Sequence, residues 1–298
     1  MAPLVSIGLP VYNGERYLEQ AINSIISQDI EDFELIISDN ASTDRTAEIC
    51  RRFAERDGRI RYIRQRTNLG AAANYNRVFQ LATGRYFRWA AHDDVMAPSL
   101  LRRCVEVLEN SAGNVVLCYP KAILIDANGD EIGCYDDALN VSQPRPHQRL
   151  LHVLRNLRMC NAAFGVVRPE ALRQTRLIGS FVASDMVLLA ELSLQGQFRI
   201  VQERLFYRRR HEAASCFANR SLEARAAWFD PVNRGRHVQP LCKHLVEHLR
   251  AVGRADLPWK DKLRCFSVVL AHWLPRWRAM GGEVKRALKC KLGLAPLA

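Results

Sequence analysis

Short apolar runs alternate with helix-patterned stretches over the first 94 residues, and few folds accept this alternation. Strand-like runs lie at residues 4–9, 33–38, 60–63 and 85–91. Between them, apolar residues recur at the three- and four-residue spacing of an amphipathic helix. Four strands separated by three helices predict an α/β fold with a mostly parallel sheet and helices on both faces.

Acidic residues follow two of these predicted strands. Asp93 and Asp94 come just after residues 85–91, and Asp39 follows residues 33–38. In an open parallel sheet, ligands gather at the carboxyl ends of strands. Carboxylates are hard ligands for Mg²⁺ or Mn²⁺, with substrate phosphates usually completing the shell. The sequence therefore predicts a nucleotide-diphosphate site with a divalent metal. The alternative is that Asp93 and Asp94 cap the helix that starts near Pro98.

The net charge of +12 lies mainly in the C-terminal part of the chain. Residues 1–215 hold 27 Lys/Arg and 25 Asp/Glu, a net of +2, whereas residues 216–298 hold 16 and 6, a net of +10. We therefore expect a boundary near residue 216. The nine cysteines form no CxxC pair, which argues against a zinc site and fits a reducing cytosol. We predict neither a signal peptide nor a membrane span, and so expect a cytoplasmic location.

Five short motifs occur in order along the first part of the chain. They are Val5-Ser-Ile-Gly-Leu-Pro-Val-Tyr-Asn13, Ile37-Ser-Asp-Asn-Ala-Ser-Thr-Asp44, Asn68-Leu-Gly70, Gly84-Arg-Tyr-Phe87 and His92-Asp-Asp94. Together they resemble the inverting family 2 glycosyltransferases of bacterial polysaccharide biosynthesis, which have the GT-A fold. The resemblance implies a catalytic domain at residues 1–215 and does not extend to residues 216–298. Within that domain, residues 1–110 would bind the nucleotide and residues 111–215 the acceptor.

The resemblance implies transfer of a sugar from a nucleotide-sugar, expected to be a UDP-sugar, with Mn²⁺ or Mg²⁺ on the diphosphate. By position, Asp39 matches the base-reading aspartate, Asp93 lies near the ribose or metal, and Asp94 matches the metal ligand. A carboxylate at Asp39 can accept from the imide N–H of uracil; the alternative is a turn residue that caps the next helix. The other residues implied for the donor pocket are Pro10, Tyr12, Asn13, Glu15, Asn68, Gly70 and Asn74.

Two positions depart from the family pattern. The family often has an arginine near the phosphates where this chain has Asn74-Tyr75-Asn76, and the nearest arginine is Arg77. His92 stands where the family has a spacer acid. We interpret Arg77 as a solvated helix position and His92 as a packed histidine.

The resemblance also implies a catalytic base at the N-terminus of a later helix, where Asp185 stands. The first helical turn stabilises an ionised carboxylate, which a base needs at neutral pH. The alternative is an ordinary N-terminal helix acid. Residues 142–159 and 161–164 are expected to face the acceptor, a saccharide or lipid-linked saccharide.

Residues 207–211 resemble the family element that closes over the diphosphate. Arg208 or Arg209 would grip phosphate through a planar guanidinium, and His211 would bind metal or phosphate. The alternative is a solvated basic cluster.

The C-terminal segment has two amphipathic helical patterns, at residues 241–249 and 262–274. The second carries Trp273, with Trp277 nearby, and clustered Lys and Arg. This combination is typical of a helix on an anionic membrane, here the inner face of the cell membrane. The alternative is packing on the catalytic domain or on a second subunit of a homodimer.

Two other function classes are weaker. A nucleotidyltransferase needs a glycine-rich, basic loop after the first strand, and residues 10–14 do not form one. A nucleic-acid-binding protein is disfavoured because the excess charge is confined to the tail and no binding module is recognisable.

Overall fold

The structure is a computed structural model that describes residues 2–111, 113–212, 214, 219, 221–236 and 238–292. The boundary predicted near residue 216 lies outside the described residues. In the N-terminal half, the elements are β1 (Val5–Val11), α1 (Leu18–Ile26), β2 (Phe33–Asp39), α2 (Thr46–Arg56), β3 (Ile60–Arg64), α3 (Ala71–Gln80), β4 (Tyr86–Trp89), β5 (Val95–Met96), α4 (Leu100–Glu109), β6 (Val115–Ile125) and β7 (Glu131–Tyr135). They are followed by α5 (Pro146–Asn156), η1 (Asn161–Phe164), β8 (Val166–Val167), α6 (Pro169–Arg173), α7 (Ser184–Gln195), β9 (Gln197–Arg209), α9 (Leu222–Phe229), η2 (Pro231–Asn233), α10 (Pro240–Arg254), α11 (Trp259–Trp273), η3 (Leu274–Arg276) and α12 (Trp277–Lys291).

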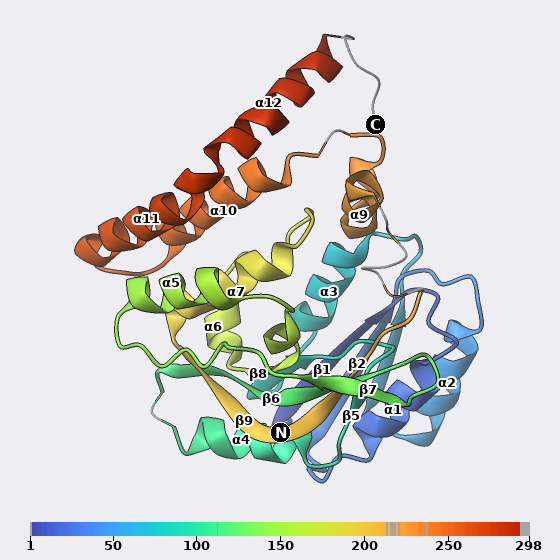
Figure 1. Cartoon of the computed structure of the whole chain (residues 1–298). Coiled ribbons are helices and arrows are strands. Elements are labelled where there is room, and N and C mark those ends of the chain that lie inside the picture. The colour runs from blue at the N-terminus through green and yellow to red at the C-terminus, as the bar shows by residue number, and fades with distance from the viewer. Residues whose placement is uncertain are drawn as a thin grey trace.

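A single sheet, with nine strands in the described part of the chain, forms the middle of the molecule (Figure 1). Its first four strands, in the order β3-β2-β1-β4, all run parallel, which confirms the prediction from the alternation. Beyond β4 the sheet is mixed, because β8 pairs antiparallel with both β4 and β6, whereas β6 and β9 run parallel. The parallel half brings the carboxyl ends of β1, β2 and β4 to one edge.

Each face of the sheet has its own hydrophobic core, because successive side chains on a strand point to opposite faces. On β2, Leu35 and Ile37 pack with α1, α2 and α4, whereas Ile36 belongs to the other core. That second core extends through α3, α5 and α7 into α10 and α11, where Val252 and Val269 are fully buried. Burial on both faces explains why these strands read as continuous apolar runs.

The second half of the sheet is less regular than the first. Residues 115–125 form one long strand, β6, whose pairing with β9 shifts register around Pro120 and Lys121. A β-bulge of this kind lets a strand continue past a proline. The stretch before α6 forms the short helix η1, followed by the two-residue strand β8.

The C-terminal helices α10 and α11 form a separate layer that packs on α7 and α5 (Figure 1). Glu247 of α10 is fully buried and pairs with Arg176, and Arg254 of α10 pairs with Glu191 of α7. One face of α10 and of α11 is therefore part of the protein interior. None of the helices in the described part is long and apolar enough to cross a membrane.

Because His248 in this layer is buried, we expect the free energy of unfolding to depend on pH. Burial and the charges of His244 and His272 lower the pKa of His248 to about 3, and His248 Nδ1 accepts from Trp273 Nε1 at 3.3 Å. The unfolded chain takes up this proton near pH 6.5 and the folded chain only near pH 3. The free energy of unfolding is therefore highest above pH 6.5 and falls as the pH drops from 6.5 towards 3, by up to about 1.4 kcal/mol per pH unit.

We expect His248→Gln, which keeps an acceptor for Trp273 but does not titrate, to flatten this dependence. Thermal unfolding at pH 7, 6, 5 and 4.5 checks it, with His152→Gln, a histidine outside this layer's core, as the matched control. Parallel curves of unfolding temperature against pH for the natural chain and His248→Gln would contradict the prediction.

Candidate active site

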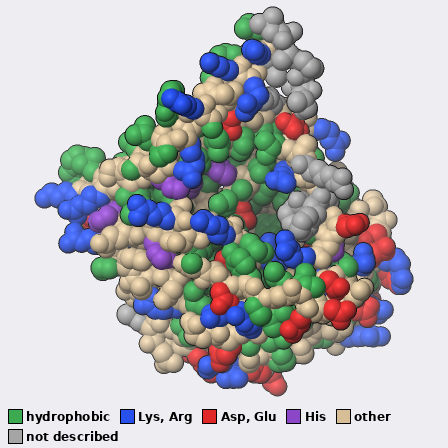
Figure 2. All heavy atoms as spheres, in the orientation of Figure 1, with side chains coloured by type: hydrophobic (Ala, Val, Ile, Leu, Met, Phe, Trp, Pro, Cys, Tyr) green, Lys and Arg blue, Asp and Glu red, His purple; other side chains and the backbone are tan. Residues whose placement is uncertain are grey.

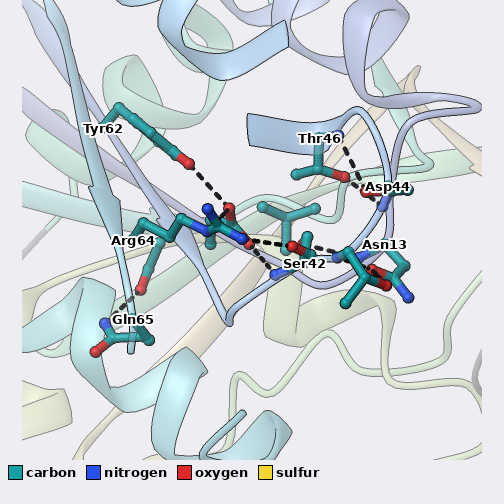
Figure 3. Close-up of polar contacts among 12 residues, drawn as sticks. Asn13, Ser42, Asp44, Thr46, Tyr62, Arg64 and Gln65 are labelled. Atoms are coloured by element: carbon teal, nitrogen blue, oxygen red, sulfur yellow. Dashed lines mark hydrogen bonds and ion pairs between the residues drawn. The ribbon is translucent and has the colours of Figure 1, made fainter. Parts of the chain in front are cut away.

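The loops after β1 and β2 are tied together by their own side chains (Figure 3). The backbone N–H of Asn13 donates to Ser42 Oγ at 2.9 Å, and Asn13 Oδ1 accepts from the N–H of Thr43 at 2.9 Å. Asn13 has a φ of 50°, a left-handed conformation that asparagine tolerates better than most residues. Glu15 Oε2 likewise accepts from the N–H of Arg45. Asn13 and Glu15 therefore shape the rim of the predicted donor pocket by holding its two loops.

Asp39 lies at the end of β2 and is fully buried. Its Oδ1 accepts from the N–H of Ser42 at 2.8 Å, and its Oδ2 accepts from the Tyr62 hydroxyl at 2.9 Å. Arg64 Nε lies 3.4 Å from the same Oδ2. Both carboxylate oxygens thus have protein partners. In contrast, Tyr12 on the adjacent loop is 43% exposed, and Pro10 is buried within β1.

The remaining predicted donor residues join the same strand ends. Asn68 Oδ1 accepts from Asn40 Nδ2 at 2.9 Å and from the N–H of Gly70 at 2.8 Å. Gly70 has a φ of 84°, and a Cβ there would lie 2.6 Å from the carbonyl oxygen of Phe229 on α9. Asn74 is buried and exchanges hydrogen bonds with Ser38, the Oγ donating to Asn74 Oδ1 at 2.6 Å. Asn68, Gly70 and Asn74 therefore lie together at the strand ends, and the Asn74 side chain is buried rather than exposed to the predicted donor pocket.

The acidic pair follows β4 and meets the end of β9. Asp94 Oδ1 accepts from the N–H of Arg209 at 2.8 Å, and Asp93 Oδ2 lies 2.9 Å from His211 Nε2. Burial, reinforced by the charge of Asp93, raises the pKa of Asp94 to about 7. Burial also acts to raise the pKa of Asp93, but the charge of His92 and the hydrogen bond with His211 outweigh it and leave this pKa below its usual value. His92 packs against Gly14, as a packed histidine would.

These residues fit a divalent cation only together with a substrate. No group of three His, Cys, Asp or Glu side chains in the described part of the chain is arranged to hold a metal. However, His211 Nδ1 is buried without a hydrogen-bond partner, while Nε2 of the same ring lies 2.9 Å from Asp93 Oδ2. Mg²⁺ is commonly held by one or two carboxylates plus substrate phosphates. Asp94 and His211 are therefore suitable as a partial shell that a diphosphate would complete.

The structure separates the roles of the two adjacent arginines on β9. Arg209 is buried, donates to Gln20 Oε1 at 2.6 Å and lies 4.6 Å from the centre of the Tyr17 ring. Arg208 points to the other face of the strand, as alternation requires, where it donates to Asn161 Oδ1 and lines a cavity. Arg208 thus faces the cavity, whereas Arg209 contacts the acidic strand end through its backbone N–H and side chain.

This cavity has a volume of about 260 Å³ and contains the predicted base. Asp185 lies in the first turn of α7, two residues after Ala183, whose φ of 57° turns the chain into the helix. Burial raises the pKa of the Cys160 thiol well above its usual value, and the charge of Asp185 and a hydrogen bond to it add to the rise. The lining residues are Ala71, Tyr75, Trp89, Cys160, Ala163, Phe164, Ile178, Val182, Ala183, Asp185, Arg208, Arg225, Trp228 and Phe229.

The cavity and the acidic strand end are close enough to interact electrostatically. Burial raises the pKa of Tyr75, and the charges of Asp93, Asp94 and Asp185 all add to that rise. Tyr75 therefore lies within the field of all three carboxylates. Arg208 lowers the pKa of Asp94 through its charge.

Sequence reasoning missed several residues at or near this cavity. Asp137 is not part of the cavity lining but interacts with Arg208, which is; burial raises the pKa of Asp137 to about 6, although Arg208 and hydrogen bonds with Tyr135 and Asn161 oppose the rise. Arg225, Trp228 and Phe229 come from α9, beyond the reach of the family resemblance. Ala163 and Phe164 lie in the stretch expected to face the acceptor, whereas residues 142–159 do not line the cavity.

Comparison with known proteins identifies the family. Residues 6–168, more than half of the chain, match the family model described as glycosyl transferase family 2. The chain belongs to glycosyl transferase family 2. Among curated relatives, it is 36% identical over 118 residues to the uncharacterized glycosyltransferase EpsJ of Bacillus subtilis and 30% identical over 117 residues to glycosyltransferase GlyG of Streptococcus pneumoniae. These matches cover 40% and 39% of this chain but only 34% and 39% of the two relatives, so the chain spans less than half of their length.

Solved structures show that this family 2 chain has the GT-A fold. S. aureus TarS 1–349 in complex with UDP-GlcNAc has a TM-score of 0.65 and 15% identity, with 91% of this chain and 72% of TarS covered. The mannosyltransferase PcManGT of Pyrobaculum calidifontis, in complex with GDP-Man and Mn²⁺, has a TM-score of 0.56 and 17% identity, with coverage of 99% and 77%. At such identities the likeness concerns the fold alone.

Proposed function

We propose that this chain is a metal-dependent, inverting glycosyltransferase that moves a sugar from a UDP-sugar to a hydroxyl of a saccharide or lipid-linked saccharide, in the biosynthesis of a cell-surface polysaccharide or glycan. The observation that carries the proposal is one shared cavity. The carboxylate of Asp185 and the guanidinium of Arg208 line the same space, within the electrostatic reach of Asp93 and Asp94. Membership of family 2 supports the reaction class.

Asp185 is the proposed general base. It accepts the proton of the acceptor hydroxyl, whose oxygen then bonds to the anomeric carbon from the side opposite the leaving diphosphate. The bond between that carbon and the phosphate oxygen breaks, and the configuration inverts. Arg208 offsets the charge that develops on the departing diphosphate, because its planar guanidinium matches phosphate oxygens. When bound at Asp94 and His211, a divalent metal supplies Lewis-acid stabilisation of the same charge.

The donor base is proposed to lie against Tyr12 and Asp39. The exposed Tyr12 ring offers a surface on which a base can stack, and Asp39 lies below the same loops. A carboxylate accepts about four hydrogen bonds, so Asp39 keeps capacity for an imide N–H beyond Ser42 and Tyr62. The structural neighbours hold UDP-GlcNAc in one case and GDP-Man in another, so the choice of uridine rests on the family resemblance and on the carboxylate of Asp39.

A thermal-shift panel of UDP-, GDP-, dTDP- and CMP-sugars with Mn²⁺ or Mg²⁺ tests the donor. A ligand at 100 times its Kd stabilises the folded protein by about 2.7 kcal/mol, so the UDP-sugar is expected to raise the unfolding temperature by about 5 °C. EDTA should remove most of this shift, and Asp39→Asn should weaken the preference for uridine. A larger shift with a GDP-sugar would overturn the donor assignment alone; no shift with any nucleotide-sugar would contradict the proposed function.

A further inference from the structure

The last two long helices expose an apolar stripe to solvent. Its residues are 44% to 70% exposed, although several are among the largest apolar side chains in the protein. On α11 and η3 they are Trp259, Leu263, Leu270 and Leu274. On α12 and just after it they are Trp277, Val284, Leu288 and Leu292. We call these eight residues the C-terminal stripe.

The C-terminal stripe is the solvent-exposed face of α11 and of α12, opposite the face by which each helix packs on the rest of the protein. Its residues recur every three, four or seven positions, which keeps them on one side of a helix. On the other side of α11, Val269 and Trp273 are buried in the core. On the other side of α12, Glu283 is buried and accepts from the N–H groups of Leu241 and Cys242, each at 3.1 Å. Both helices are thus held by one face and present the other.

Cations flank the stripe, whereas the acids on these helices are already paired. The exposed cations are Lys260, Arg264, Arg276, Arg278, Lys285, Arg286 and Lys289. Asp261 pairs with Arg264 at 3.3 Å, and Glu283 faces α10. Figure 2 shows Lys and Arg side chains interspersed with hydrophobic ones at the upper left, where Figure 1 places α11 and α12. The surface therefore combines exposed apolar area with positive charge.

We propose that the C-terminal stripe binds the surface of a bilayer that contains anionic phospholipids. Tryptophan and leucine can enter the boundary between headgroups and acyl chains, while flanking Lys and Arg attract anionic headgroups. A second copy of this chain would place cations against cations, which opposes a homodimer through this face. Charge complementarity thus favours the bilayer. This inference does not depend on the proposed sugar transfer.

Co-sedimentation of the full chain with vesicles tests it. Binding is expected to vesicles of phosphatidylcholine with added phosphatidylglycerol, to be weak with phosphatidylcholine alone, and to fall at high salt. Each cation near an anionic surface contributes about fivefold in affinity. The triple variant Arg278→Glu, Lys285→Glu, Lys289→Glu should therefore bind at least about 100-fold more weakly. The variant Leu270→Ser, Leu274→Ser, Trp277→Ser should also lose binding.

Matched controls use exposed residues elsewhere. Arg51→Glu, Arg56→Glu, Arg61→Glu changes the net charge equally, and Ile132→Ser removes a 53% exposed apolar side chain. Both controls should bind vesicles like the natural chain, and all variants should keep its unfolding temperature. Equal vesicle binding by the stripe variants and the natural chain would overturn the proposal. The proposal would also be overturned if the natural chain did not bind vesicles but formed a concentration-dependent dimer that the variant Leu270→Ser, Leu274→Ser, Trp277→Ser abolished. A second copy of the chain would then be the partner.

Discussion

Asp185→Asn is expected to lower kcat by at least about 1,000-fold while leaving donor affinity within about twofold. The carboxamide keeps the size of the side chain in the cavity but cannot take up a proton at neutral pH. Asp185 lies in the first turn of α7, away from the loops after β1 and β2 that are proposed to hold the nucleotide. Release of nucleoside diphosphate in the presence of acceptor measures turnover, and the thermal shift with donor measures binding.

Glu170→Gln is the matched control for Asp185→Asn. Glu170 also lies in the first turn of a helix, α6, but its side chain is 74% exposed and it does not line the cavity. Its turnover should be unchanged. If Asp185→Asn kept near-full turnover, the base assignment would fail. If Asp137→Asn removed turnover and Asp185→Asn did not, Asp137, the second carboxyl group near Arg208, would be assigned as the base instead.

Asp94→Asn is expected to lower turnover at least about 100-fold and to abolish the part of donor binding that depends on Mn²⁺ or Mg²⁺. The amide keeps an oxygen that can accept from the N–H of Arg209, so the junction with β9 is retained. It loses the negative charge that a divalent cation needs. Donor thermal shifts with Mn²⁺ and with EDTA measure the effect, and the two should become equal in this variant.

The control for Asp94→Asn is Asp130→Asn, an exposed acid in the turn between β6 and β7. It should retain the full difference between Mn²⁺ and EDTA. If Asp94→Asn kept this difference, Asp94 would not be a metal ligand. The other proposed features of the donor pocket would not be affected by that result. Equal unfolding temperatures without ligand would exclude misfolding as the cause of lost binding.

Local patterns were sufficient to predict the first half of the sheet. The runs at residues 33–38 and 60–63 correspond to β2 and β3 within one residue. Both faces of β2 are buried, whereas β3 lies at the edge of the sheet and was recognised by its isoleucines and tyrosine alone. The acidic ends of β2 and β4 were predicted because a charged residue after a buried run marks where the strand leaves the core.

The site itself depends on contacts between distant segments. Nothing local distinguishes Arg208 from Arg209, yet β9 turns one toward the cavity and the other toward Gln20. Similarly, Asn74 matches a donor residue by position, but its amide is occupied by Ser38. Asp137 lies in an irregular stretch whose pattern carries no functional signal.

By itself, the sequence determined the parallel α/β half, the family and the acidic strand ends, because these depend on periodicity and short motifs within a few residues of each other. Only the tertiary structure decided that Asp185, Arg208 and α9 share one cavity. It also decided which face of α11 and α12 is buried and which remains exposed. The cavity also includes Tyr75, and α11 packs on α5, so in both cases segments more than a hundred residues apart meet, which local periodicity does not encode.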